Sequence, residues 1–158
     1  MNRQKAIFAA GCFWSVEDAL RKVPGVLEAL SGYTGGHTDN PTYEQVCAGT
    51  SGHAEAVKVT YDPEKISYEE LVRKFFSLHN PTQVNRQGPD VGTQYRSTIF
   101  YGTDEEKETA EEVKEELAKT YHPQTIATEI TPASTFYPAE DYHQRYFEKH
   151  PGRAVCHF

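Results

Sequence analysis

The residue with the clearest chemical potential is Cys12, which lies between an apolar run at 5–10 and an amphipathic pattern at 13–22. The apolar run predicts a buried strand, and the helical spacing of the pattern predicts a helix. A thiol at the turn between them would lie at a helix N-terminus, where unpaired N–H groups and the helix dipole favour the thiolate. Such positions lower a cysteine pKa from about 8.5, and the thiolate is the nucleophilic form.

The neighbours of the cysteine favour a reactive thiol over a small buried core residue. Gly11 precedes it and allows a sharp turn with close approach of a ligand. Phe13 and Trp14 follow it, so two large apolar rings lie beside the sulfur. A buried cysteine that only fills space requires neither a preceding glycine nor the chain's only tryptophan after it.

Further polar candidates occur in three glycine-containing segments at 35–47, 49–55 and 87–97. We expect these segments to meet near one end of a sheet, where glycines let the backbone approach a substrate. The candidates are Tyr43, His53, Glu55, Asp90 and Tyr95. Glu55 shares the apolar side of a predicted strand, and a buried glutamate needs a partner or a proton.

Each of the other candidates has a plain structural alternative. Tyr43 and Tyr95, taken singly, are typical half-buried packing residues with a solvated hydroxyl. Asp90 could cap its own loop, and His53 is as compatible with a structural as with a catalytic role. The sequence alone leaves these alternatives open.

Composition sets the broad class. A chain of 158 residues predicts a single catalytic domain over 1–158, and a net charge of −7 argues against nucleic acid as a partner. No apolar stretch approaches the roughly 20 residues of a membrane span, and the N-terminal apolar run is too short for a signal peptide. We therefore expect a cytoplasmic protein with reduced thiols, no membrane association and a monomeric state. Neither the three distant cysteines nor the histidines have metal-ligand spacing, so no metal is expected.

The pattern of elements predicts an α+β fold. Strands are expected at 5–10, 26–35, 53–62, 95–101 and 125–131, and helices at 13–22, 67–79, 103–120 and 139–149. A long loop at 80–94 is of a length that is often functional. The order matches the split βαβ arrangement, which predicts a ferredoxin-like two-layer sandwich. We expect a mixed sheet with helices mainly on one face and a flexible C-terminal coil tail at 150–158.

Together these motifs resemble the A class of peptide methionine sulfoxide reductases. The resemblance runs through GCFWSVE, GYTGG, YEQVCAGTSGHAEAV, QGPDVGTQYRS and AEDYHQRYF, in order over nearly the whole chain. It implies that Cys12 is the nucleophile and that Phe13 and Trp14 receive the substrate methyl group. The polar group around the sulfoxide oxygen would be Glu55, Tyr43 and Tyr95, with Asp90 in support. We also include Gly11 and His53 among the substrate-binding residues.

The reaction implied by the resemblance is reduction of methionine-S-sulfoxide, free or in proteins, with thioredoxin (or dithiothreitol in vitro) as reductant and no bound cofactor. Thiolate attack on the sulfoxide sulfur drives charge onto the oxygen, which must be met by a proton or by fixed donors. Two phenols can donate without ionising. Glu55 can deliver the proton only if burial raises its pKa from about 4.3.

A second thiol is needed to resolve the sulfenic acid that oxygen transfer leaves on Cys12. Cys156, in the tail after Pro151 and Gly152, is the predicted resolving residue. Cys47 is predicted to be a buried bystander in a short helix. Many relatives have a longer glycine-rich tail with a further cysteine, whereas this sequence ends at Phe158, so a two-cysteine route is expected.

Two other function classes fit parts of the sequence. A Cys–His hydrolase would need an oriented histidine near Cys12, and His53 or His143 could be nominated. A small-molecule binding module is compatible with a split βαβ domain. The aromatic pair after Cys12 and the lack of a recognisable Cys–His pairing place both below the reductase.

Overall fold

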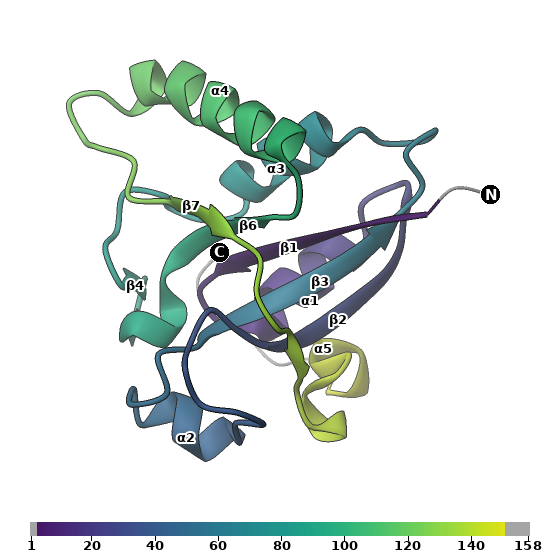
Figure 1. Ribbon diagram of the computed structural model, residues 1–158, viewed down its shortest axis with the longest axis vertical. Coiled ribbons are helices and arrows are strands. Elements are labelled where there is room, and N and C mark those ends of the chain that lie inside the picture. Colours follow the sequence, from purple (N-terminus) through teal and green to yellow (C-terminus); the bar gives the residue numbers. More distant parts are fainter. Residues whose placement is uncertain (1–2, 151–158) are drawn as a thin grey trace.

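A mixed sheet forms the centre of the computed structural model, which describes residues 3–150 (Figure 1). Its strands are β1 (Gln4–Ala10), β2 (Val26–Thr34), β3 (Ala54–Tyr61), β6 (Ser97–Tyr101), β7 (Glu129–Pro132) and β8 (Tyr137–Pro138). They lie side by side in the order β7-β6-β1-β3-β2-β8, with β7 parallel to β6 and the other neighbours antiparallel. The inner order β6-β1-β3-β2 is that of a split βαβ fold, so the predicted fold class is confirmed.

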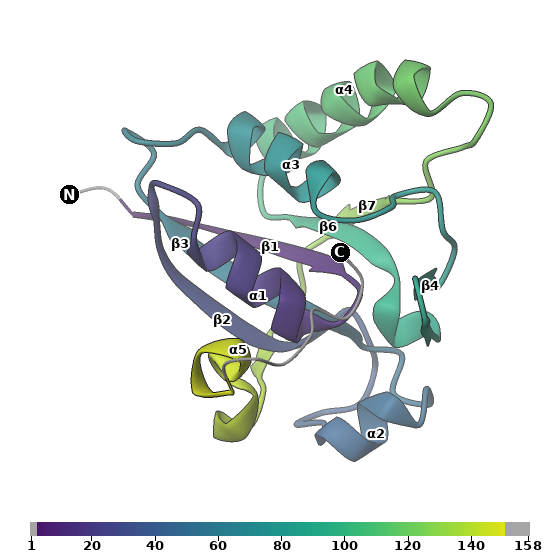
Figure 2. The same cartoon turned by 180° about the vertical axis from the view of Figure 1, so that it is seen from behind.

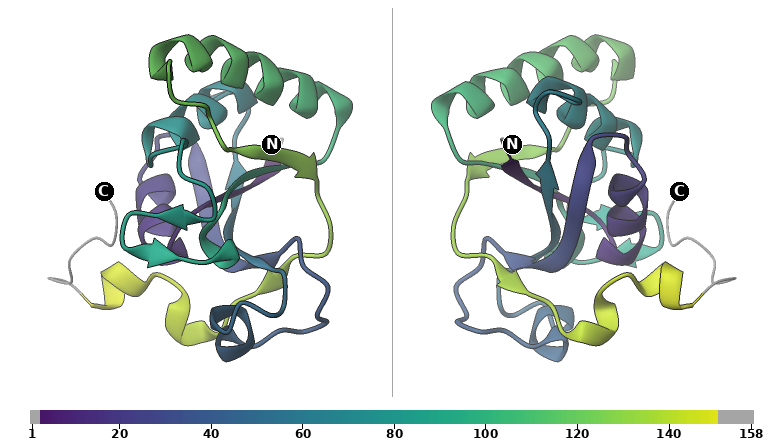
Figure 3. Two further views of the ribbon diagram at one scale, coloured as in Figure 1. Left: turned by 90° about the vertical axis from the view of Figure 1, so that its left-hand side faces the viewer. Right: turned by 90° about the vertical axis from the view of Figure 1, so that its right-hand side faces the viewer.

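The helices lie mainly on one face of this sheet, as predicted. Helices α1 (Phe13–Arg21) and α3 (Tyr68–Ser77) cover the face turned toward the viewer in Figure 2, and Figure 3 shows them on the same side. Helix α4 (Asp104–Tyr121) packs on α3 and reaches β6 and β7. Ser67 and Glu70 form the predicted capping box that begins α3.

Successive side chains of the central strands point to opposite faces of the sheet, so the buried apolar residues form two layers, one on each face. On β1, Ala6 and Phe8 belong to the large core under the helices, whereas Ile7 and Ala9 face the other side. The register pairs Phe8 with Val57 of β3, which belongs to the same helix-side core. The main core therefore lies between the sheet and its helices.

The opposite face of the sheet is covered by the extended segment between β7 and β8 rather than by a helix. Its buried residues include three alanines, Ala9, Ala54 and Ala56. Because these side chains are small, the segment between β7 and β8 can cross close to the sheet, as Figure 1 shows. Phe136 of that segment packs on this layer, and the Lys58 ammonium lies 4.9 Å from its ring centroid.

The predicted helix at 139–149 is wrong. The structure has a 3₁₀ turn, η2 (Asp141–His143), and a short helix α5 (Tyr146–Lys149). Arg145 between them has a left-handed backbone with φ 52°, which interrupts the helix. The Gln144 side chain bonds both the N–H and the carbonyl of Ser31, so tertiary contacts replace the helical pattern here.

The predicted boundaries around the long loop also need correction. Within 80–94 the chain forms a small hairpin of β4 (Arg86–Gln87) and β5 (Asp90–Val91), which the sequence did not indicate. The strand predicted from Tyr95 begins at Ser97, because Tyr95 ends a 3₁₀ turn, η1 (Thr93–Tyr95). The predicted edge strand at 125–131 is observed as β7 and begins later, at Glu129.

Two further observations bear on the predicted organisation. Of the predicted tail at 150–158, only His150 belongs to the part that the structure describes. None of the helices in residues 3–150 combines the length and the apolar character that a membrane span requires.

Gly32 allows β8 to pair closely with β2, and this contact can be tested. A Cβ at Gly32 would meet the Phe136 ring and lie 2.5 Å from the Tyr137 carbonyl oxygen. We expect Gly32→Ala to lower the free energy of unfolding by about 1–3 kcal/mol in urea titrations. Gly102→Ala is the control, because its Cβ would meet only Glu106 Oε1 at 3.5 Å, and a change below about 0.5 kcal/mol is expected. Equal effects of the two substitutions would contradict the close packing of β8.

Candidate active site

Cys12 occupies the N-cap of α1, immediately after β1 and the turn at Gly11. Gly11 has φ 94°, a left-handed conformation that favours glycine, and Cys12 returns to an extended conformation at φ −60°, ψ 121°. The Cys12 carbonyl accepts the N–H of Val16 and so begins the helix. The predicted strand–turn–helix setting of the thiol is therefore confirmed, with Cys12 only 8% exposed.

Glu55 approaches the same helix end from β3. Its Oε1 accepts the backbone N–H of Phe13 at 3.1 Å, across 42 positions of sequence. The residue is 1% exposed and comes two positions before Val57, the partner of Phe8 on β1. Antiparallel pairing of β1 with β3 therefore brings a buried carboxyl group to the first turn of the helix that Cys12 caps.

Two phenols belong to the same electrostatic environment. Tyr43 begins the short helix α2 (Tyr43–Cys47), which Thr42 and Gln45 cap, and Tyr95 ends η1. Burial raises the pKa of both tyrosines, and the nearby Glu55 carboxyl group adds to the increase in each case when it is ionised. Both hydroxyls are therefore protonated at neutral pH and can donate a hydrogen bond, which for Tyr43 goes to the Cys47 thiol in this structure.

Asp90 lies on the inward side of the β4–β5 hairpin, paired with the buried Gln87. Burial raises the pKa of Asp90, and its Oδ2 has no hydrogen-bond partner among residues 3–150. Its charge contributes to the raised pKa of Tyr95, as does that of Cys12. Tyr95 therefore lies within electrostatic reach of both the nucleophile candidate and this carboxyl group.

His53 has a supporting position next to the site. Its Nδ1 accepts the N–H of Gly36 at 3.0 Å, and its Nε2 donates to the Thr38 carbonyl at 2.7 Å. Both ring nitrogens are thus bonded to the turn after β2. A Cβ at Gly36 would fall against the backbone of Ser51 and Gly52, so this turn and the one before β3 are in close contact.

Trp14 is held between two residues of the C-terminal segment. Its Nε1–H donates to His143 Nδ1 at 2.9 Å, and its ring stacks on Tyr146 with centroids 3.7 Å apart and planes at 7°. His143 also packs against Phe13 and Tyr43, at 5.2 and 4.2 Å between centroids. Phe13, Trp14 and these partners form a continuous aromatic wall beside Cys12. We did not predict His143 or Tyr146 as wall residues, and only the AEDYHQRYF motif contained them.

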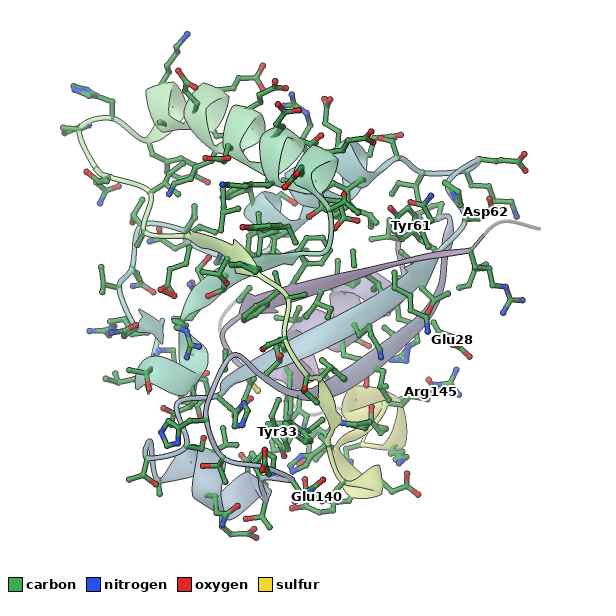
Figure 4. The ribbon with its side chains drawn as sticks, in the orientation of Figure 1. Glu28, Tyr33, Tyr61, Asp62, Glu140 and Arg145 are labelled. Carbon is green, nitrogen blue, oxygen red and sulfur yellow. The ribbon has the colours of Figure 1, made fainter. Side chains whose placement is uncertain are left out.

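The carboxylate of Glu140 joins the wall to two other elements. It accepts the Tyr33 hydroxyl of β2 at 2.8 Å and the Tyr43 N–H of α2 at 3.0 Å. Although burial acts to raise the pKa of Glu140, these hydrogen bonds hold it below its usual range. Figure 4 shows Tyr33 and Glu140 at the α2 end of the molecule, with Tyr61 and Asp62 at the other end of the sheet. The sequence had given no signal for this contact.

The second cysteine does not match its prediction. The short helix is confirmed, but Cys47 is exposed rather than buried. Its thiol shares a hydrogen bond with Tyr43, and partial burial raises the pKa of that thiol. Cys156 lies outside the described residues. Within 3–150, no group of His, Cys, Asp and Glu side chains has an arrangement that could hold a metal.

Comparison with known sequences agrees with the geometry. The family model described as peptide methionine sulfoxide reductase matches residues 4–158. A protein of Methanothermobacter thermautotrophicus named peptide methionine sulfoxide reductase MsrA is 56% identical over 151 residues, 95% of this chain and 89% of that protein. A Thermus thermophilus protein of the same name is 52% identical over 158 residues, covering 100% of this chain and 89% of its own.

Solved structures show the same likeness. Mxr1 from Saccharomyces cerevisiae in reduced form superposes with a TM-score of 0.91 at 38% identity, covering 99% of this chain and 91% of that one. Methionine sulfoxide reductase A of Corynebacterium diphtheriae gives 0.86 at 37% identity, covering 98% and 78%. Mxr1 in complex with Trx2 gives 0.67 at 25% identity, covering 99% and 88%. The chain therefore belongs to the peptide methionine sulfoxide reductase family.

Proposed function

We propose that this protein reduces methionine-S-sulfoxide, free or in proteins, to methionine, with Cys12 as the nucleophile. The observation that carries the proposal is the combination of a cysteine at a helix N-cap position with a buried carboxyl group that accepts the next backbone N–H, beside an aromatic wall. A sulfoxide offers an electrophilic sulfur, an accepting oxygen and an apolar methyl group. The site holds a chemically matched group for each.

In the first step, the Cys12 thiolate attacks the sulfoxide sulfur and charge develops on the oxygen. Glu55 transfers its proton to that oxygen, while the hydroxyls of Tyr43 and Tyr95 donate hydrogen bonds to it. The raised pKa values of the two tyrosines support this assignment, because both phenols keep their protons. Asp90 has a supporting role from the hairpin, because its charge helps to keep the proton on Tyr95.

The acid role of Glu55 requires its neutral form. Two features support that form: Glu55 is almost completely buried, and a thiolate at the same helix end disfavours a second negative charge. The helix N-terminus stabilises one anion, and the proposal places that anion on sulfur before the reaction. After proton transfer, the carboxylate takes its place.

Oxygen transfer leaves Cys12 as a sulfenic acid and releases methionine. The Cys156 thiol then attacks the Cys12 sulfur, water leaves with the oxygen, and a disulfide forms. A dithiol reductant returns both cysteines to thiols. The structure of Mxr1 in complex with Trx2 supports thioredoxin as that reductant, and we expect a monomeric enzyme in the reducing cytoplasm.

The aromatic wall accounts for selection of one epimer. Phe13 and Trp14 offer an apolar surface to the methyl group, whereas Glu55 and the phenols require the oxygen on their side. A sulfoxide of the opposite configuration cannot satisfy both contacts with its sulfur at Cys12. A purely structural role for Cys12 as a buried core residue does not explain why an aromatic wall and these polar groups lie near it.

Neither of the two histidines nominated for the hydrolase alternative is placed to act as its base. His53 uses both ring nitrogens on the turn after β2. His143 accepts the Trp14 N–H on Nδ1, so in the neutral ring its Nε2 carries the proton, and neither nitrogen offers a lone pair to a thiol. Both histidines nominated for a Cys–His pair are therefore engaged elsewhere.

Glu55→Gln tests the acid role. The amide retains the size of the side chain but cannot supply the proton, so kcat for methionine sulfoxide should fall by about 100-fold or more with little change in KM. Glu28→Gln, an exposed position on β2, is the matched control and should retain the parental kcat. Parental rates for Glu55→Gln throughout pH 6–9 would show that another group supplies the proton.

The thiol assignments can be tested by mass spectrometry without reductant. After one equivalent of methionine sulfoxide, we expect a Cys12–Cys156 disulfide and one equivalent of methionine. Cys156→Ser should instead accumulate a sulfenic acid on Cys12 that dimedone traps, and Cys47→Ser should behave as the parent. Because Cys47 is exposed near Tyr43, a Cys12–Cys47 disulfide is the alternative outcome, and it would remove Cys156 from the mechanism.

The neutral state of His143 predicts a pH dependence of stability. Burial lowers the pKa of His143, whereas an unfolded histidine binds a proton near pH 6.5. Because the unfolded state then holds more protons, the folded state loses stability as the pH falls below about 6.5, by up to about 1.4 kcal/mol per unit. Urea titrations at pH 7.5 and 5.5 should show a larger loss for the parent than for His143→Gln. Equal losses would mean that His143 does not titrate differently on folding.

A further inference from the structure

The residues that cover Trp14 lie on an irregular segment, and one turn fixes their positions. His143 ends η2 and Tyr146 begins α5, so the turn at Gln144 and Arg145 sets the angle between the two side chains. Arg145 has φ 52° and ψ 42°, a conformation that residues with a Cβ seldom adopt. A turn of this kind persists only where its surroundings hold it.

Glu17 of α1 holds this turn. Its Oε1 accepts the Arg145 backbone N–H at 2.6 Å, across 128 positions of sequence, and lies 3.4 Å from Ser31 Oγ. Its Oε2 lies 3.2 Å from the guanidinium of Arg21. The residue is 1% exposed, and burial raises its pKa. A short hydrogen bond from a backbone N–H to a buried carboxylate is among the stronger contacts that a side chain makes.

The geometry of α1 connects this contact with the aromatic wall. Trp14 and Glu17 are three residues apart on α1, so they lie on neighbouring positions of one helix face. The same face of α1 thus carries the Trp14 ring and Glu17, which bonds the segment that covers this ring. Figure 2 shows α5 beneath α1, and Figure 4 shows Arg145 on that segment beside β2.

Other contacts of the segment do not replace this one. The Gln144 side chain ties the turn to Ser31 and Ala139, which fixes it against β2 rather than against α1. The ion pair between Arg21 and Glu148 joins α1 to α5, but Glu148 is 57% exposed. Exposed pairs of this kind contribute little.

We propose that Glu17 is a positioning residue for the methyl pocket, because its bond to the Arg145 N–H holds His143 and Tyr146 against Trp14. This inference rests on the proposed function, which assigns the aromatic wall to the substrate methyl group. The shape of that binding site would depend on a carboxylate that does not touch the substrate. Glu17 acts through a side chain long enough to accept the Arg145 N–H, and not through its charge opposite Arg21.

Two conservative substitutions of Glu17 separate the effect of side-chain length from the effect of charge. Glu17→Asp keeps the charge near Arg21 but is one methylene too short to bond the Arg145 N–H. Glu17→Gln loses the charge but keeps an oxygen at the same distance. Asp18→Asn is the matched control, because Asp18 also pairs with Arg21 and has no contact with the turn.

Fluorescence of Trp14, the only tryptophan of the chain, reports directly on the wall. For Glu17→Asp we expect emission at longer wavelength, stronger quenching by acrylamide, and about a tenfold higher KM for methionine sulfoxide with kcat within about twofold. Glu17→Gln and Asp18→Asn should remain near the parent in all three. The rate of Cys12 alkylation by iodoacetamide should be the same in every variant.

Three outcomes overturn the proposal. The first is parental fluorescence and KM for Glu17→Asp. The second is a larger effect of Glu17→Gln than of Glu17→Asp, which would assign the role to the charge opposite Arg21. The third is a changed fluorescence without a changed KM. Should the parent fail to reduce methionine sulfoxide at all, the proposed function fails, whereas the fluorescence comparison still decides whether Glu17 holds the wall.

Discussion

The site depends on one hydrogen bond, from the Phe13 N–H at the start of α1 to the Glu55 carboxyl group. It joins the end of β1, the helix with Cys12 at its N-cap and the strand β3, so the proposed nucleophile and the proposed acid share a single helix terminus. A helix N-terminus stabilises one negative charge well. The proposed chemistry uses this limit, because it places the single charge on the Cys12 sulfur before the reaction and on the Glu55 carboxylate after it.

A second constraint is that the aromatic wall is built from both ends of the described chain. Trp14 comes from the first helix, and His143 and Tyr146 come from the segment after the last strand. That segment lies against β2 and α1 through Gln144 and Glu17 rather than through regular secondary structure. The position of the aromatic wall thus depends on polar contacts that lie behind it.

Prediction from the sequence succeeded where local signals and tertiary demands agreed. The glycine before Cys12, the amphipathic pattern of α1 and the capping box at Ser67 each specify a local conformation, and the structure contains all three. It failed at 139–149, where helical spacing is overridden by a left-handed residue at Arg145 and by the side chain of Gln144. Cys47 was placed in the right helix but on the wrong side, because a short helix has too few residues to define a buried face.

The sequence by itself determined the local elements around Cys12 and Glu55 and the chemical types that the candidate site contains: a thiol at a helix start, a carboxyl group on the apolar side of a strand, and aromatic residues next to the thiol. Only the tertiary structure decided which of them meet. The antiparallel register of β1 with β3 brings Glu55 to Phe13, and the return of the chain past β8 brings His143 to Trp14. The physical reason is that capping and periodicity act over a few residues, whereas these contacts join positions separated by 42 and 129 residues.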